Sequence, residues 1–215
     1  MNYSQDDWIY QPAANADTLL IFAHGAGADM SHDFMQTMAD LLVDAGFSVL
    51  RFNFPYMQKS ALDGKRRPPD RAATLLACWH NTLELVLQQY PADNVFLLGK
   101  SMGSRIATML AGQALPAVVK GVISLGYPFL PKGKNEPRLD AINDCKLPLL
   151  IVQGERDSFG TREQLTCWPL PALVELQFVP DGNHSFEPRK LSGVTLMQNY
   201  HQAVSHILAF TRSHQ

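Results

Sequence analysis

Residues 99–103 read Gly-Lys-Ser-Met-Gly and match the pattern G-x-S-x-G around Ser101. In this pattern the serine lies on a tight turn between a strand and a helix, and the turn exposes its hydroxyl. Residues 95–98 are typical of a strand, and the residues after the serine have helical spacing. We therefore predict that Ser101 is a nucleophile, although the five residues by themselves are also compatible with a structural turn.

A serine hydroxyl is a weak nucleophile near neutral pH and needs a base that takes its proton. His184 follows the last predicted strand in a Gly-Asn-His turn, and we predict that it is this base. Asp157 follows the preceding strand and is the predicted acid that orients the imidazole. Glu155 and Asp181 are the alternative acids. The chain order of serine, aspartate and histidine is the order that accompanies this kind of nucleophile turn.

Residues 24–27 read His-Gly-Ala-Gly and follow the first predicted strand. Such a loop supplies a backbone N–H that stabilises the oxyanion of an acyl-transfer reaction. We predict that the N–H groups of Ala26 and Met102 form this oxyanion hole, and that His24 orients the loop rather than reacts. Activity should then rise with pH around the ordinary histidine pKa of ~6.5 or somewhat above it.

Motifs for nucleotides and metals are incomplete in this chain. Asn94 stands where a phosphate-binding loop needs its first glycine, and Met30 stands where a dinucleotide motif has its third. The sequence has no His-Glu-x-x-His motif, and its three cysteines are too far apart for a C-x-x-C pattern: Cys78, Cys145 and Cys167. We predict no cofactor, no metal, and reduced, mostly buried thiols.

The composition bounds the class of protein. The chain has 215 residues, of which 46% are hydrophobic and 18% charged, so disorder is excluded as its main state. A net charge of −2 gives no basic field that would attract nucleic acid. Asp6 and Asp7 stand where a signal peptide is positively charged, and no apolar run approaches the ~18 residues of a membrane span. We expect one domain over residues 1–215, cytoplasmic, with no nucleic-acid or membrane partner.

Strands and helices alternate along the chain and must position these residues. Continuous apolar runs predict parallel strands buried on both faces at 18–23, 47–54, 94–98, 121–125, 149–153 and 173–179. Apolar stripes with helical spacing predict helices within 34–45, 75–87, 102–110 and 197–208. The alternation predicts a doubly wound α/β fold with a mostly parallel sheet of about six to seven strands flanked by helices. Ligands bind beyond the carboxyl ends of such strands, where the predicted catalytic residues fall.

With these residues in place, the chain resembles the α/β-hydrolase superfamily, in its small dienelactone-hydrolase-like branch. It is most similar to the group containing testis-expressed hydrolase-like proteins and a histone-acetylation-complex subunit, in segments 52–57, 66–70, 98–105, 126–128 and 153–160. The resemblance implies the fold without a lid domain, since only about twenty residues separate Tyr127 from Leu147, and a triad as assigned. It implies no substrate. Dienelactone hydrolases use a cysteine where this chain has Ser101, so lactone hydrolysis is not transferred.

Two loops are predicted to frame the site, at 56–70 and 128–134, and they carry the basic residues Lys59, Lys65, Arg66, Arg67, Lys132 and Lys134. We predict Tyr56, Arg66, Arg67 and Tyr127 as substrate-binding residues, with a solvated surface as the alternative for the basic ones. The predicted function is a serine hydrolase of carboxylesterase type, acting on a small-molecule ester or thioester. The alternatives are an interaction or scaffold protein of the same fold with little turnover, and a small peptidase. The sequence does not indicate a protein partner.

Overall fold

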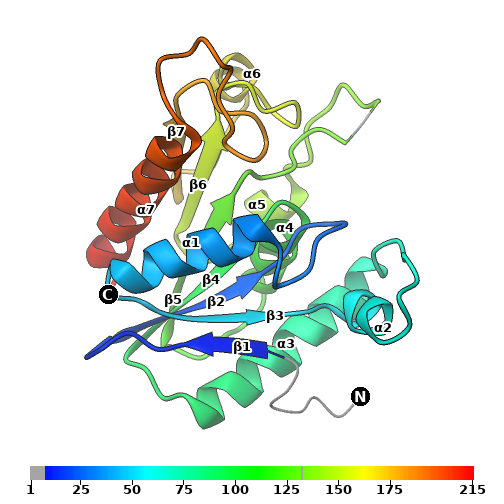
Figure 1. Cartoon of the computed structure of the whole chain (residues 1–215), viewed down its shortest axis with the longest axis vertical. Coiled ribbons are helices and arrows are strands. Elements are labelled where there is room, and N and C mark those ends of the chain that lie inside the picture. The colour runs from blue at the N-terminus through cyan, green and yellow to red at the C-terminus, as the bar shows by residue number, and fades with distance from the viewer. Residues whose placement is uncertain (1–7, 132) are drawn as a thin grey trace.

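The computed structural model describes residues 8–131 and 133–215, so the acidic start of the chain and Lys132 lie outside the described residues. A sheet of seven strands runs through the molecule (Figure 1). Six strands coincide with the predicted apolar runs: β2 (Thr18–Ala23), β3 (Ser48–Phe52), β4 (Asn94–Lys100), β5 (Val119–Leu125), β6 (Leu149–Gly154) and β7 (Val174–Val179). The remaining strand, β1 (Trp8–Gln11), has four residues, which are too few to establish a sequence period.

The strands lie in the order β1-β3-β2-β4-β5-β6-β7. The edge strand β1 is antiparallel to β3, and all other neighbouring pairs are parallel. The predicted fold class, a doubly wound and mostly parallel sheet, is confirmed. All parallel strands therefore end at the same edge, and the loops that leave β2, β4, β6 and β7 meet there.

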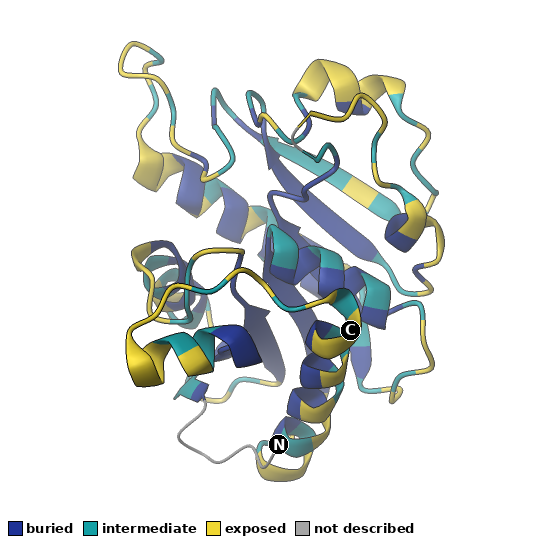
Figure 2. Ribbon diagram, turned by 90° about the vertical axis from the view of Figure 1, so that its right-hand side faces the viewer, coloured by how far each residue is buried: buried dark blue, intermediate teal, exposed yellow. Residues whose placement is uncertain are grey.

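Helices cover both faces of the sheet. Two long helices lie on each face: α1 (Asp33–Asp44) and α7 (Leu196–Ser213) on one, α3 (Ala72–Gln89) and α4 (Met102–Leu110) on the other (Figure 1). Successive strand residues point to opposite faces, so Leu20 packs with the first pair and Ile21 with the second. The buried surfaces of these helices face the sheet (Figure 2). This double burial explains why the strands read as continuous apolar runs.

One predicted loop is half helical. Residues 56–63 belong to α2 (Pro55–Asp63), which begins with a proline at its first position and ends before Gly64, whose φ is 69°. Both positions are typical of helix ends, because a first-turn proline loses no hydrogen bond and glycine adopts a left-handed conformation readily. The helix buries only its first two residues, so it lacks the apolar stripe by which a helix is recognised. The prediction of a loop was wrong for this part and right for 64–70.

The segment between β5 and β6 contains no large insertion among its described residues, which form loops and the four-residue helix α5 (Asp140–Asn143). The expected absence of a lid domain at this place is therefore confirmed. A further short helix, α6 (Arg162–Cys167), follows β6. Cys78 and Cys145 are buried, whereas Cys167 is exposed. None of the helices in the described ranges combines the length and apolar character needed to cross a membrane.

Candidate active site

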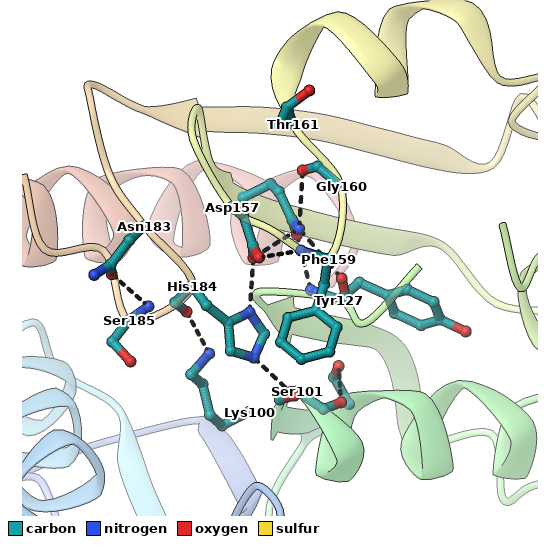
Figure 3. Close-up of polar contacts among 12 residues, drawn as sticks. Lys100, Ser101, Tyr127, Asp157, Phe159, Gly160, Thr161, Asn183, His184 and Ser185 are labelled. Atoms are coloured by element: carbon teal, nitrogen blue, oxygen red, sulfur yellow. Dashed lines mark hydrogen bonds and ion pairs between the residues drawn. The ribbon is translucent and has the colours of Figure 1, made fainter. Parts of the chain in front are cut away.

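The structure brings the three predicted catalytic side chains together at the carboxyl edge of the sheet (Figure 3). Ser101 follows β4, Asp157 follows β6 and His184 follows β7. The Oγ of Ser101 lies 2.8 Å from Nε2 of His184, and Nδ1 of His184 lies 2.7 Å from Oδ2 of Asp157. An unbroken hydrogen-bonded chain thus connects the hydroxyl to a carboxylate.

The turn that carries Ser101 has an unusual backbone. Its φ is 50° and its ψ is −112°, a conformation that residues with a Cβ rarely adopt. A Cβ at Gly99 would overlap the backbone at Ser104, and one at Gly103 would lie 2.5 Å from the carbonyl oxygen of Ala23. The two glycines of the motif are therefore needed because α4 lies against β4 and β2. This close packing projects the serine side chain from the sheet edge.

The Asp157 carboxylate is fully buried and is held by three donors. Its Oδ2 accepts hydrogen bonds from His184 Nδ1 and from the Gln153 amide at 2.8 Å, and its Oδ1 accepts from the Phe159 N–H at 2.8 Å. Gln153 is oriented in turn, because its Oε1 accepts from the Tyr127 N–H at 2.8 Å. The acceptor at Oδ2 places the His184 proton on Nδ1, so that Nε2 is available to the serine hydroxyl.

The two alternative acids have other partners. Glu155 forms an ion pair with Arg162 at 2.6 Å and accepts a hydrogen bond from the Asp181 N–H. Asp181 forms an ion pair with Arg189 at 2.6 Å. Neither carboxylate is hydrogen-bonded to His184 in the described part of the chain. The geometry favours Asp157.

The surroundings of His184 lower the pKa of its imidazole below 6.5. Burial is the main cause, and the charge of Lys100 acts in the same direction, while the hydrogen bond to Asp157 opposes it. The ring of Phe159 covers the imidazole, with the ring centres 4.5 Å apart. The sequence-based expectation of a pKa at or somewhat above the ordinary value is therefore corrected. The pKa of His184 is lowered because loops bury the imidazole, and the positions of these loops could not be predicted from the sequence.

We expect hydrolysis of a neutral ester to rise with pH through a midpoint below 6.5. His184 must be neutral to accept the serine proton, and a lowered pKa means that it is neutral over a wider pH range. The value of kcat/KM should reach its maximum near pH 7 and fall at lower pH as the imidazole is protonated. The measurement is kcat/KM between pH 4.5 and 8, with circular dichroism as a control for unfolding. A midpoint above 6.5 in folded protein would contradict burial as the dominant influence.

His24 fixes the loop that follows β2. It is buried, and burial lowers its pKa to about 4, so the ring is neutral. Its Nδ1 lies 2.8 Å from the Gly25 carbonyl oxygen, and its Nε2 accepts a hydrogen bond from the Phe54 N–H at 3.1 Å. The ring thus ties this loop to the start of α2. Ala26 lines the cavity beside Ser101, and Met102 is the first residue of α4.

A cavity of about 230 Å³ opens beside Ser101 and His184. Its walls come from the loop after β2, the start of α1, the turn at Ser101 and the loop after β7. The remaining lining residues are Gly25, Ala26, Gly27, Ala28, His32, Phe34, Met35, Lys100 and Ser185. This volume is below the ~300–1,000 Å³ of pockets for drug-sized ligands, so the cavity suits a small acyl or alcohol group.

The structure does not bring the two predicted tyrosines into this cavity. The Tyr56 side chain is buried, and its hydroxyl donates a hydrogen bond to the Gly25 carbonyl at 3.4 Å, so it supports the loop. Tyr127 is fully buried against Phe129, with the ring centres 4.8 Å apart, and Figure 3 shows its ring pointing away from Ser101. Their predicted role in substrate binding is corrected to one in packing. Both follow strands as expected, but their side chains turn into the core.

The two predicted arginines lie at the surface. Arg66 and Arg67 line a shallow hollow that also includes Ala26 and Gly27 of the loop after β2. Arg67 donates two hydrogen bonds to the Asp63 carboxylate, each 2.6 Å long. The arginines therefore lie beside the site but are not part of the cavity that contains Ser101.

Sequence reasoning missed three residues that contact the hydrogen-bonded chain. Gln153 and Phe159 hold or cover its members, and the Lys100 ammonium donates a hydrogen bond to the His184 carbonyl at 2.5 Å. Lys100 stands inside the motif, but at a position where the motif accepts any residue. Gln153 is a polar residue at the end of an apolar strand, which is the one signal that could have indicated it.

Comparison with known proteins identifies the family. A model of the alpha/beta hydrolase domain matches residues 16–212. An alpha-beta serine hydrolase homologue from Coxiella burnetii is 21% identical with a TM-score of 0.72, over 93% of this chain and 90% of that one. A lidless a/b serine hydrolase from Xanthomonas campestris is 20% identical with a TM-score of 0.67, over 95% of this chain and 88% of that one.

A dienelactone hydrolase from Anabaena variabilis is 20% identical with a TM-score of 0.70, over 94% of this chain and 90% of that one. At these identities the structural likeness shows the fold. The family model is the stronger finding, because it spans nearly the whole of the sheet and its helices. The chain belongs to the alpha/beta hydrolase domain family.

Proposed function

We propose that the protein is a serine hydrolase of carboxylesterase type, which cleaves a small ester or thioester through an acyl-enzyme. The observation that carries this proposal is the hydrogen-bonded chain from Ser101 through His184 to Asp157, with contacts of 2.8 and 2.7 Å at the wall of a cavity. Membership of the alpha/beta hydrolase family supports it. Within that family we propose kinship to the dienelactone-hydrolase-like branch and to the testis-expressed group.

In the first half-reaction the Ser101 oxygen attacks the substrate carbonyl carbon while its proton passes to Nε2 of His184. The N–H groups of Ala26 and Met102 stabilise the resulting oxyanion. The tetrahedral intermediate then collapses, and the leaving alkoxide or thiolate takes the proton from Nε2. Asp157 stays ionised throughout and stabilises the imidazolium.

In the second half-reaction a water molecule attacks the acyl-enzyme. His184 accepts one proton of this water and returns it to the Ser101 oxygen as the acid leaves. The enzyme regains its starting state, and the net reaction is addition of one water across the ester or thioester bond.

Labelling with a fluorophosphonate probe tests this proposal. We expect stoichiometric modification of the wild-type protein on the peptide containing Ser101, because the probe reports an activated serine. Ser101→Ala should remain unlabelled under the same conditions. A folded wild-type protein that stays unmodified after long incubation would contradict the proposal and favour a binding role for the fold.

A panel of acyl esters, thioesters and peptides then tests the leaving group. We expect hydrolysis of short-chain 4-nitrophenyl esters and of acyl thioesters, because the small cavity admits short chains. Peptide amides should be cleaved more slowly. Faster cleavage of an amide than of the matched ester would indicate a peptidase.

A further inference from the structure

Lys100 is a buried basic side chain at the second position of the Gly-Lys-Ser-Met-Gly motif, directly before Ser101. Lys100 is 8% exposed, and its Nζ donates a hydrogen bond to the carbonyl of His184 at 2.5 Å (Figure 3). The same nitrogen lies 5.4 Å from the ring centre of Phe34 and 5.9 Å from that of Phe186. The ammonium is thus held between aromatic rings and the loop that carries the catalytic histidine.

The ammonium has more donors than partners. A protonated lysine offers three N–H groups, and the described residues supply one acceptor, the His184 carbonyl. No carboxylate in the described ranges forms an ion pair with it. Burial lowers the pKa of Lys100 to about 7, and the charge of Asp157 opposes this shift from a distance. Near neutral pH the amine is therefore only partly protonated, and an anion from outside the chain would stabilise its charged form, because buried charges are usually paired.

The cavity beside Ser101 is where such an anion can reach Lys100. Lys100 lines this cavity together with Ser101 and His184, and no aspartate or glutamate of the described chain is among the lining residues. Two further residues whose side chains can donate hydrogen bonds line the same cavity: Ser185 and His32. Nδ1 of His32 accepts the Phe34 N–H, so Nε2 is the ring nitrogen that can donate. A carboxylate in the cavity would meet hydrogen-bond donors, and no described lining residue carries a negative charge.

We propose that Lys100 is a specificity-determining residue that binds a carboxylate of the substrate, and that the preferred substrates are esters or thioesters of short dicarboxylic acids. The cleavage of these substrates rests on the proposed hydrolase function, whereas the binding of a carboxylate by Lys100 does not depend on it. The acids are short because the cavity is about 230 Å³ and Lys100 is next to the nucleophile in the chain. The ester carbonyl lies at Ser101 and the distal carboxylate at the ammonium.

The surface arginines are weaker candidates for the same task. Arg67 already directs two N–H groups at Asp63, and Arg66 is exposed to solvent, where ion pairs contribute little. Lys100 is shielded from water, and a charge-assisted hydrogen bond is stronger there. The preference for an anionic ester is therefore assigned to Lys100 and not to the segment around Arg66.

Binding is measured first, in the Ser101→Ala background, where turnover does not interfere. The probes are monomethyl succinate and its neutral isostere methyl succinamate, and the method is titration calorimetry. We expect the anionic ester to bind about tenfold or more tightly, as a hydrogen bond to a charged group predicts. Lys100→Met should abolish this preference. Lys146→Met, an exposed lysine before β6 at the opposite sheet edge, should retain it.

Equal affinity of the two esters for Ser101→Ala would overturn the inference without any lysine variant. The inference would also be overturned if the preference for the anionic ester survived in Lys100→Met, or if Arg66→Ala/Arg67→Ala removed it instead. Lys100→Gln serves as a second variant if the methionine disturbs folding, since its amide is a hydrogen-bond donor that carries no charge. Thermal melts of each variant verify the fold.

Turnover separates substrate recognition from a merely structural role. With Ser101 present, Lys100→Gln should raise KM for the anionic ester about tenfold and leave KM for the neutral ester nearly unchanged. Equal losses in kcat for both esters would show that Lys100 only positions His184, and would overturn the inference. If fluorophosphonate labelling fails while the binding preference holds, the hydrolase function is wrong and the carboxylate site stands.

Discussion

Ser101→Ala is expected to lower kcat by roughly 10⁶-fold, as loss of a nucleophile does in a serine protease. Alanine keeps the Cβ that already occupies this turn at a φ of 50°, so the substitution adds no backbone strain. It removes the Oγ that contacts Nε2 of His184 at 2.8 Å, and the described residues place no other hydroxyl on that nitrogen. The measurement is steady-state hydrolysis of a short-chain ester, with a thermal melt as evidence of folding.

The matched control is Ser205→Ala, which removes a hydroxyl on α7 that is bonded to a backbone carbonyl. It should hydrolyse the ester at the wild-type rate. Retention of more than about 1% of activity by a purified Ser101→Ala sample would contradict the nucleophile assignment.

Asp157→Asn is expected to lower kcat by roughly 10⁴-fold, by analogy with the aspartate of serine proteases. Three N–H donors point at this carboxylate, from His184, Gln153 and Phe159. An asparagine replaces one of the two carboxylate oxygens by an NH₂ group, which then faces N–H donors instead of acceptors. With the NH₂ at the Oδ2 position, His184 can accept there only as the tautomer that carries its proton on Nε2, which cannot act as a base toward Ser101.

Glu155→Gln makes the same chemical change two residues earlier and serves as the control. It weakens the ion pair to Arg162 but does not touch His184, so activity should stay within a few-fold of the wild type. Comparison of kcat for both variants with the same ester decides the question. A larger loss in Glu155→Gln than in Asp157→Asn would mean that the wrong acid has been assigned.

The sheet and the nucleophile turn could be predicted because each leaves a local mark on the sequence. Strands buried on both faces need continuous apolar residues, as at 18–23 and 149–153. Gly99 and Gly103 are required by backbone contacts that allow no Cβ, so the turn reads as a motif. Because β4, β6 and β7 are parallel, their ends lie at one edge of the sheet, which is how three residues distant in the sequence could be predicted to meet.

Features that depend on distant loops could not be predicted. Position after a strand tells which edge a residue occupies but not which way its side chain points, and both Tyr56 and Tyr127 turn inward. Gln153 has a role at the site because its amide hydrogen-bonds both the Asp157 carboxylate and the backbone of Tyr127. Lys100 reaches the carbonyl of a residue 84 positions later. β1 and α2 were missed for a related reason, since neither buries enough apolar surface to establish a period.

The strand that precedes His184 lies at the margin of the sheet. Within the described sheet β7 pairs with β6 alone, and most of its residues are partly exposed, whereas Ser101 follows a strand buried along its whole length. Edge elements with few buried contacts open by local unfolding at lower free energy than the centre of a domain. Under mild denaturant His184 would therefore detach while the central strands and the turn at Ser101 stay folded. Inactivation would precede the loss of helical circular dichroism, so residual activity measures the integrity of this margin and not the global stability of the protein.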